Sequence, residues 1–176
     1  MEEILILVDK NDKPLGSGFK IPIHQQGLLH RAFSIFIFNN QGELMLQQRA
    51  AKKYHSGKLW TNSCCGHPRW GENTDDAAHR RLGEEMGMDC KLYPVSTLVY
   101  RAQVSNNLIE HEYDHIYVGL FNDSPKINFN EANDWKWQDT VQLEKELKNS
   151  PEQFTIWFRE IINKRTMREV ESWKPG

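Results

Sequence analysis

The stretch TNSCCGHP, residues 61–68, gathers three side chains that could do chemistry. Cys64 and Cys65 are adjacent, and His67 follows two positions after the second thiol. Such a group could bind a metal, pack in a buried turn, or present a reactive thiolate. A zinc knuckle is the weakest interpretation, because adjacent cysteines do not readily occupy two corners of one tetrahedron and structural zinc sites usually separate them by about two to four residues. The residues alone leave the buried turn and the thiolate open.

A second stretch, IEHEYD at residues 109–114, places Glu110 and Glu112 on one face of an expected strand. That face continues through three apolar residues, Ile116, Val118 and Leu120. The two carboxylates therefore point toward the core, where an unpaired charge is strongly unfavourable. They need a metal, basic partners or a raised pKa, unless the strand emerges into solvent before Ile116.

Three histidines, His24, His30 and His67, could add imidazole ligands to these carboxylates. Three imidazoles and two carboxylates would form a site of high coordination number for Mn²⁺, Mg²⁺ or Zn²⁺. A histidine taken alone is more often a surface residue or a satisfied core residue than a ligand. The sequence therefore presents this metal site as one alternative.

Residues 66–88, GHPRWGENTDDAAHRRLGEEMGM, resemble the Nudix box, a loop–helix–loop motif that binds diphosphate through divalent cations. The match has one departure, because Arg81 stands where the family pattern has glutamate. Independently of the resemblance, Glu84 and Glu85 are adjacent carboxylates at the negative end of an expected helix, a conflict that a cation would relieve. The alternative is that both are solvated and pair with Arg80 and Arg81, each pair contributing only about 0.3 kcal/mol.

Taken together with HQQGLLHRAFSIFIFN upstream, these segments resemble the type 1 isopentenyl-diphosphate Δ-isomerase family over nearly the whole chain. That family moves a proton across an allyl unit using a metal and a cysteine–glutamate pair. The resemblance implies catalytic roles for Cys65, Glu112, Tyr100 and Trp157. It implies metal ligation by His24, His30, His67, Glu110 and Glu112, and by Glu85 for the Mg²⁺ that accompanies the diphosphate. It implies diphosphate binding by Lys20, Arg49, Lys53 and Arg81.

Hydrophobic periodicity and turn residues predict the elements that would position these side chains. Strands are expected at residues 4–8, 31–38, 43–49, 93–102 and 108–121, with 31–38 and 43–49 paired as a hairpin. A helix is expected from Asn73 or Thr74 to Gly87, whereas residues 50–72 have no sustained period and predict a long ordered loop. Paired strands with few helices indicate an α+β fold. The resemblance implies a Nudix-like α/β/α sandwich with a mixed sheet and flanking helices.

The last expected helix begins at the capping signal Ser150-Pro151-Glu152-Gln153. Its apolar residues repeat at helical spacing: Phe154, Trp157, Phe158, Ile161 and Ile162. That spacing alone makes Trp157 a member of a core stripe. Only the family resemblance places it beside a carbocation.

Composition limits the classes of function. The chain has 176 residues, which predicts one domain over residues 1–176, and its net charge of −2 provides no basic surface for nucleic acid or anionic membrane. Three cysteines do not suit a disulfide framework, and MEEILILVDK lacks a basic region followed by an apolar core. We therefore expect a cytoplasmic protein that acts on a small molecule, without nucleic acid, membrane or an obligate protein partner.

These observations favour an isomerase of C5 isoprenoid diphosphates that uses Mg²⁺ with the diphosphate and Mn²⁺, Zn²⁺ or Mg²⁺ at the His/Glu site. One alternative is a Nudix hydrolase of a nucleoside diphosphate derivative, because metal-activated water would use Glu84 and Glu85. Another is a non-catalytic metal- or diphosphate-binding domain. Cys65 together with Glu112 separates the first hypothesis from the others, since hydrolysis needs no thiol.

Overall fold

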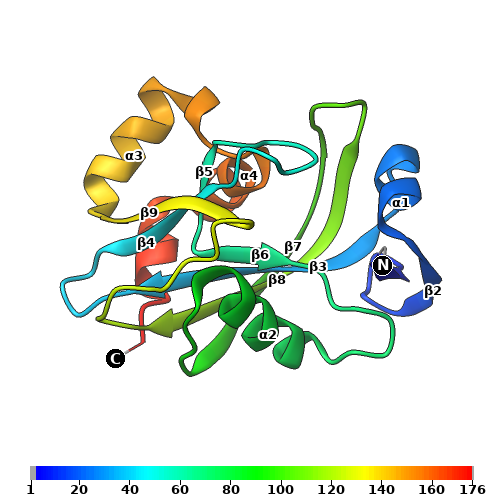
Figure 1. The fold of residues 1–176 in the computed structure, drawn as a ribbon, viewed down its shortest axis with the longest axis horizontal. Coiled ribbons are helices and arrows are strands. Elements are labelled where there is room, and N and C mark those ends of the chain that lie inside the picture. Colours follow the sequence, from blue (N-terminus) through cyan, green and yellow to red (C-terminus); the bar gives the residue numbers. More distant parts are fainter. Residues whose placement is uncertain (1–2, 176) are drawn as a thin grey trace.

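The sheet is organised around β3, His30–Phe38, which lies at its centre (Figure 1). The computed structural model describes residues 3–175, so the first two residues of the N-terminal stretch discussed above lie outside it. Residues 32–38 are buried throughout, and apolar side chains dominate both faces of the strand. Such a near-continuous apolar run is typical of a strand covered on both sides.

The neighbours of β3 make the sheet mixed. Strand β8, Ile109–Leu120, runs parallel to β3, and β7, Leu92–Gln103, pairs antiparallel with β8. On its other edge β3 pairs antiparallel with short segments of three strands: β1, Ile4–Val8; β6, Cys64–Gly66; and β4, Leu44–Arg49. The remaining strands are β2, Pro14–Phe19, which pairs with β1, and β5, Trp60–Thr61, and β9, Ala132–Gln138, which both pair with β4.

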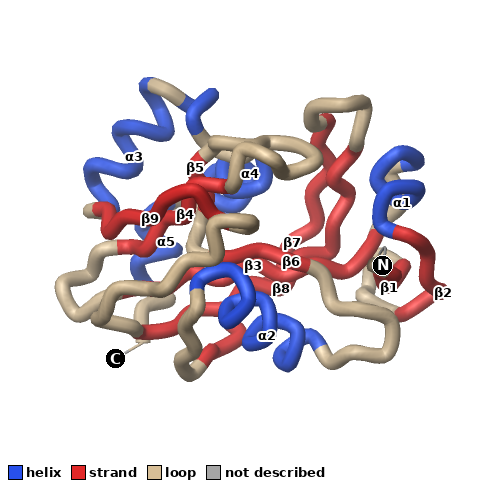
Figure 2. Tube along the Cα trace, viewed as in Figure 1, coloured by secondary structure: helices blue, strands red, loops and turns tan. Residues whose placement is uncertain are grey.

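Helices cover both faces of the sheet, as Figure 2 shows for α2 on one side and α3 and α4 on the other. The helices are α1, Lys20–Gln26; α2, Thr74–Met86; α3, Thr140–Asn149; α4, Ile156–Arg165; and α5, Met167–Ser172. One core cluster joins α2 to one face of β3, and another joins α4 and α5 to the opposite face. The predicted α/β/α sandwich is confirmed. No helix within residues 3–175 has the length and apolar character needed to cross a membrane.

The predicted Nudix-box helix is confirmed at both ends. Asn73 is the N-cap, and its side chain accepts a hydrogen bond from the backbone N–H of Asp75 at 2.8 Å. Gly87 ends the helix in the left-handed conformation, with φ of 59°. A Cβ at this position would lie 2.1 Å from the Lys126 carbonyl oxygen, so only glycine fits here.

Two expectations about elements were wrong or incomplete. The C-terminal helix does not begin at Ser150: a short 3₁₀ turn, η1, Pro151–Gln153, comes first, and α4 starts only at Ile156. The cause is a hydrogen bond between distant segments. The Thr155 N–H donates to the Trp60 carbonyl oxygen and holds the chain extended between η1 and α4. The segment 50–72 is not all loop, since it contains β5 and β6, which are too short to show a period.

The predicted hairpin of residues 31–38 and 43–49 is confirmed as antiparallel, but the two strands are paired only at Phe38 and Leu44. Beyond that point β6 occupies the edge of β3, opposite Phe33, Ser34 and Ile35. This splaying brings Cys65 into the sheet next to β3.

Candidate active site

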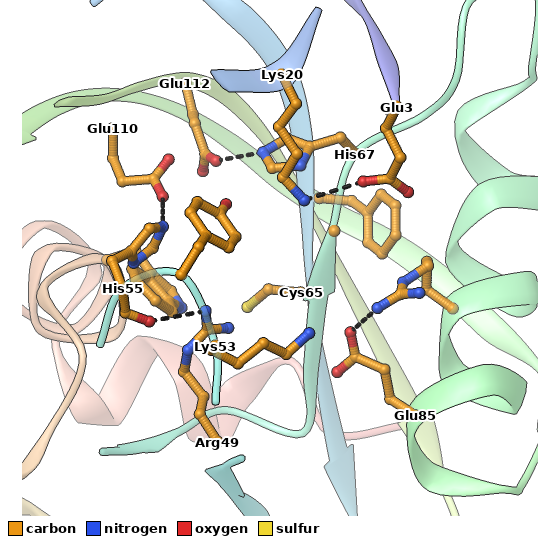
Figure 3. Close-up of a pocket in the computed structure, with 15 residues that line it drawn as sticks. Glu3, Lys20, Arg49, Lys53, His55, Cys65, His67, Glu85, Glu110 and Glu112 are labelled. Atoms are coloured by element: carbon orange, nitrogen blue, oxygen red, sulfur yellow. Dashed lines mark hydrogen bonds and ion pairs between the residues drawn. The ribbon is translucent and has the colours of Figure 1, made fainter. Parts of the chain in front are cut away.

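A solvent-accessible pocket lies where the central strands meet α1, α2 and the segment after β4 (Figure 3). Ten of the residues singled out from the sequence line it: Lys20, Arg49, Lys53, Cys65, His67, Arg81, Glu85, Glu110, Glu112 and Trp157. The other three, His24, His30 and Tyr100, are buried behind the wall and contact lining carboxylates. All the predicted site residues are therefore brought together.

The three histidines and two carboxylates of the predicted metal site form one buried cluster. Each of His24, His30, His67, Glu110 and Glu112 offers a ligand atom, and these atoms all lie within 4.8 Å of one another. Sheet register produces this arrangement, because His30 on β3 is the direct neighbour of Glu112 on β8. The strand-alternation prediction that both carboxylates point inward is confirmed by their burial.

Hydrogen bonding behind the cluster sets the tautomers of two histidines. His24 Nδ1 lies 2.7 Å from the Lys20 carbonyl oxygen, and His30 Nδ1 lies 2.9 Å from the Leu28 carbonyl oxygen. Because a carbonyl only accepts, Nδ1 carries the proton and a neutral ring turns the Nε2 lone pair toward the carboxylates. His24 Nε2 then faces Glu110 Oε2 at 3.2 Å, and neither buried atom has a satisfied hydrogen bond. These residues fit a divalent cation.

The pKa values in the cluster follow the same electrostatics. Burial by itself would raise the pKa of both carboxyl groups, but contacts with the histidines outweigh it and hold the pKa of Glu110 and of Glu112 well below the usual range. Of the three alternatives drawn from the sequence, a raised pKa is therefore wrong. Burial opposes a charge on His24, but Glu110 raises its pKa overall. Burial and neighbouring positive groups lower the pKa of His67 well below its usual range, so this imidazole stays neutral beside two charged carboxylates, a combination that favours a bound cation.

Tyr100 supports Glu112 from the opposite strand. The two residues are direct neighbours in the β7–β8 pairing, and the Tyr100 hydroxyl donates a hydrogen bond to Glu112 Oε2. The other carboxylate oxygen, Oε1, lies 2.8 Å from His67 Nε2. Burial and the adjacent carboxylates raise the pKa of Tyr100 far above its ordinary value, so the phenol stays a donor.

The two cysteines of TNSCCGHP have different surroundings. Cys64 is fully buried in the core cluster on the α2 side, whereas Cys65 lines the pocket. The Cys65 thiol donates to Asn62 Oδ1 at 3.1 Å and lies 3.6 Å from Ser34 Oγ. The potential metal-ligand cluster within residues 3–175 includes His67 but neither cysteine, which argues against a zinc knuckle.

Burial, with a smaller contribution from neighbouring carboxyl groups, keeps the Cys65 thiol protonated by raising its pKa. Burial and the carboxyl groups of Asp114 and Glu112 raise the pKa of Cys65 to about 12, although the contacts with Ser34 and Asn62 act in the opposite direction. Ser34 itself donates to Asp114 Oδ2 at 2.8 Å. The reactive thiolate stays a prediction, and it requires positive charge to be brought into this pocket.

The basic side chains of the pocket are held by carboxylates or by backbone. Lys20 pairs with Glu3 at 2.9 Å. Lys53 and Arg81 both contact Glu131 Oε2. Arg49 Nη2 donates to the carbonyl oxygen of His55 at 3.3 Å. Three of these four cations are thus paired with protein carboxylates, with which an anionic ligand would compete.

Glu84 and Glu85 have different surroundings, so the two interpretations drawn from the sequence do not apply equally to both residues. The Glu84 side chain is 39% exposed and pairs with Arg80 at 3.2 Å and with Arg81 at 2.6 Å, so the solvated ion-pair interpretation holds for it. Glu85 is buried, lines the pocket, and accepts a hydrogen bond from Gln47 Nε2 at 2.8 Å. Its carboxylate also contacts Arg81.

Trp157 belongs to both settings that the sequence left open. Trp157 lies in the first turn of α4, packs in the core cluster that α4 forms with the sheet, and also lines the pocket. Its indole Nε1–H donates to Thr61 Oγ1 at 3.0 Å, which sets the plane of the ring. The Arg49 guanidinium lies 4.9 Å from the ring centroid, so the face of the indole already interacts with a cation.

Known proteins resemble this chain over nearly its full length. The NUDIX domain family model matches residues 28–158. Isopentenyl-diphosphate Delta-isomerase 2 from Photorhabdus laumondii is 56% identical over 174 residues, covering 99% of this chain and 98% of that protein. Isopentenyl-diphosphate Delta-isomerase from Serratia proteamaculans is 58% identical over 173 residues, covering 98% and 97%. The chain belongs to the isopentenyl-diphosphate Delta-isomerase family.

Solved structures place this isopentenyl-diphosphate Delta-isomerase family member in the Nudix fold. A crystal structure of a Deinococcus radiodurans protein matches with a TM-score of 0.78 and 19% identity, covering 92% of this chain and 98% of that one. The MutT protein from Methanosarcina mazei matches with a TM-score of 0.63 and 17% identity, covering 77% and 91%. The family and the fold expected from the sequence are both confirmed.

Sequence reasoning missed four lining or neighbouring residues: Glu3, Tyr54, His55 and Glu131. The first three are in short segments without periodicity, so nothing in the sequence indicates where their side chains point. Glu131 contacts Arg81 across 50 positions of sequence. In this isopentenyl-diphosphate Delta-isomerase family member only the tertiary fold reveals these contacts.

Proposed function

We propose that this protein interconverts isopentenyl diphosphate and dimethylallyl diphosphate by adding a proton at C4 and removing one from C2. The supporting observation is that Glu112 and Cys65 reach the same pocket, with the basic side chains beside them (Figure 3). A C–H bond forms at C4, the double bond shifts, and a C–H bond breaks at C2. The substrate gains one proton and loses one, so its atoms and charge balance. Glu112 ends as a carboxylate and Cys65 as a thiol, and proton exchange with solvent restores their starting states before the next turnover.

Glu112 is the proton donor in this proposal, and Cys65 accepts the proton on the opposite face of the alkene. An unactivated alkene is a weak base, so the acid must be strong and held in position. The contacts that lower the pKa of Glu112 make its protonated form a stronger acid, and the Tyr100 hydroxyl limits how the carboxylate can rotate. Cys65 takes the departing proton as the thiolate.

The cation site is assigned to His24, His30, His67, Glu110 and Glu112, whose geometry fits a divalent ion. When bound there, Mn²⁺, Zn²⁺ or Mg²⁺ would supply positive charge that increases the acidity of Glu112. We assign Glu85 to the Mg²⁺ that accompanies the diphosphate, because its carboxylate is buried and faces the same pocket.

The diphosphate is bound by the basic side chains of the pocket, Lys20, Arg49, Lys53 and Arg81. Arg81 departs from the Nudix box in a way that suits this role, because it exchanges a carboxylate for a phosphate ligand. The face of Trp157 stabilises the tertiary carbocation by up to about 2 kcal/mol once water is excluded. The substrate is thus a small C5 diphosphate.

The test uses purified protein with isopentenyl diphosphate, Mg²⁺ and Mn²⁺ in D₂O, followed by NMR. Wild type should form deuterated dimethylallyl diphosphate, and Cys65→Ala and Glu112→Gln should abolish it. Cys90→Ala is the matched control, because Cys90 is not among the residues that line the pocket. Release of inorganic phosphate instead would identify a hydrolase and refute the proposal.

A further inference from the structure

His55 is a buried imidazole in the segment between β4 and β5, and its side chain lines the pocket. Only 3% of the residue is exposed. Its Nε2 lies 2.8 Å from Glu110 Oε1, as the dashed line in Figure 3 marks. Within residues 3–175 this buried nitrogen makes no hydrogen bond of good geometry, so the close contact with Glu110 is its nearest polar interaction. The second oxygen of the same carboxylate, Oε2, faces His24. Glu110 is therefore held between two imidazoles.

The two imidazoles present different atoms to Glu110. His24 has Nδ1 against a backbone carbonyl, so its neutral ring directs a lone pair toward the cluster. His55 Nδ1 lies 3.1 Å from the Ser56 hydroxyl oxygen instead, and a hydroxyl can donate. A ring that accepts from Ser56 carries its proton on Nε2. His55 therefore suits a donor to the carboxylate, and it lies outside the cluster of ligand atoms.

His55 also connects Glu110 to two other walls of the pocket. Its ring meets Trp157 edge to face, with centroids 5.7 Å apart. Its backbone carbonyl accepts a hydrogen bond from Arg49, whose guanidinium stacks on the same indole. A change in the position of this imidazole would shift the metal-site carboxylate relative to the aromatic wall and to a diphosphate-binding arginine.

We propose that His55 is a positioning residue that donates its Nε2–H to Glu110 Oε1 and thereby aims Oε2 at the cation site. The inference rests on the cation site of the proposed function. Groups that orient a metal-binding carboxylate typically change metal affinity by roughly 10–100-fold when they are removed. The same effect is expected here without any direct bond between His55 and the metal.

The experiment measures Mn²⁺ affinity in the absence of substrate, by calorimetry and by electron paramagnetic resonance. His55→Leu removes the donor while keeping an apolar side chain, and we expect the Kd to rise by roughly 10–100-fold. His55→Gln places an amide donor near the position of Nε2, and we expect it to stay within about threefold of wild type. His79→Gln is the control, because His79 is paired with Asp89 on the surface of α2.

A double mutant distinguishes positioning from a general loss of structure. In a Glu110→Gln background the carboxylate is already lost, so adding His55→Leu should weaken Mn²⁺ binding no further. Additive losses, a folded His55→Leu variant with wild-type affinity, or a His55→Gln variant as weak as His55→Leu would each overturn the inference. Because no substrate is present, these results stand apart from whether the protein isomerises isopentenyl diphosphate.

Discussion

Replacing Tyr100 with phenylalanine removes one oxygen atom from the pocket wall and tests whether Glu112 is a positioned acid. The hydroxyl is buried, at 2% exposure of the residue, and donates to Glu112 Oε2. A hydrogen bond to a charged group contributes about 1.5–3 kcal/mol. Each 1.4 kcal/mol corresponds to about a tenfold change, so the full effect on the rate would be roughly 10–150-fold. Because His67 still holds Oε1, we expect the lower part of that range.

The assay compares kcat for dimethylallyl diphosphate formation with metal saturating. Tyr117→Phe is the matched control, since this tyrosine also donates its hydroxyl to a carboxylate, that of Asp75, but does not line the pocket. Its kcat should stay within about twofold of wild type, because the missing bond lies outside the site. A folded Tyr100→Phe variant with a kcat within about threefold of wild type would show that Glu112 does not depend on this donor.

Three further predictions concern the metal, the basic wall and the thiol. Removing divalent cations with a chelator should lower the Tm of wild type by roughly 5–10 °C in calorimetry, because a cation at 100 times its Kd stabilises the fold by about 2.7 kcal/mol. If the chelator lowered the Tm of Glu110→Gln by the same amount, the His/Glu cluster would not be the cation site. Glu131→Gln should lower KM for isopentenyl diphosphate about two- to fivefold, because the Glu131 carboxylate, whose ion pair contributes about 0.5–1 kcal/mol, no longer competes with the diphosphate for Lys53 and Arg81. An unchanged or higher KM would contradict this prediction. In metal-free protein, Cys65 should react with iodoacetamide at pH 8 at least about tenfold more slowly than a small thiol, because its pKa of about 12 leaves little thiolate. Peptide mass spectrometry measures the labelling rate, and faster labelling would refute that pKa.

The strand bearing Glu110 and Glu112 could be predicted because its period of two leaves little choice. Apolar residues at 116 and 118 identify the inner face, and the carboxylates of Glu112 and Glu110, four and six positions before Ile116, lie on the same face. The Nudix-box helix was equally predictable, since a cap residue and a terminal glycine act locally. The roles of the site residues and the single-domain extent over residues 1–176 stay predictions.

His55 and Glu131 could not have been placed from the sequence, because their positions depend on contacts between distant segments. His55 meets Glu110 across a loop that has no regular period. The start of α4 was misplaced for a similar reason. Ser150 precedes a 3₁₀ turn without a side-chain capping bond, and a bond from the Thr155 N–H to the Trp60 carbonyl oxygen delays the helix. Local signals are overridden where a tertiary hydrogen bond is available.

The pairing of β8 also limits how the length of this chain can change during evolution. Glu112 lies opposite His30 on one neighbouring strand and Tyr100 on the other. Shifting β8 by one residue would turn His111 and Tyr113 inward and both glutamates outward. A single-residue insertion within the paired segment would thus turn both glutamates out of the site, and with them the proposed acid and two of the proposed metal ligands. The β7–β8 pairing already contains one extra residue, in the bulge between Pro94 and Ser96 on β7, which lies at the end of the pairing away from Glu110 and Glu112. Insertions and deletions in this family are therefore expected in the bulge and in the turn at residues 104–108, whereas the paired residues 96–103 and 109–116 should vary by substitution alone.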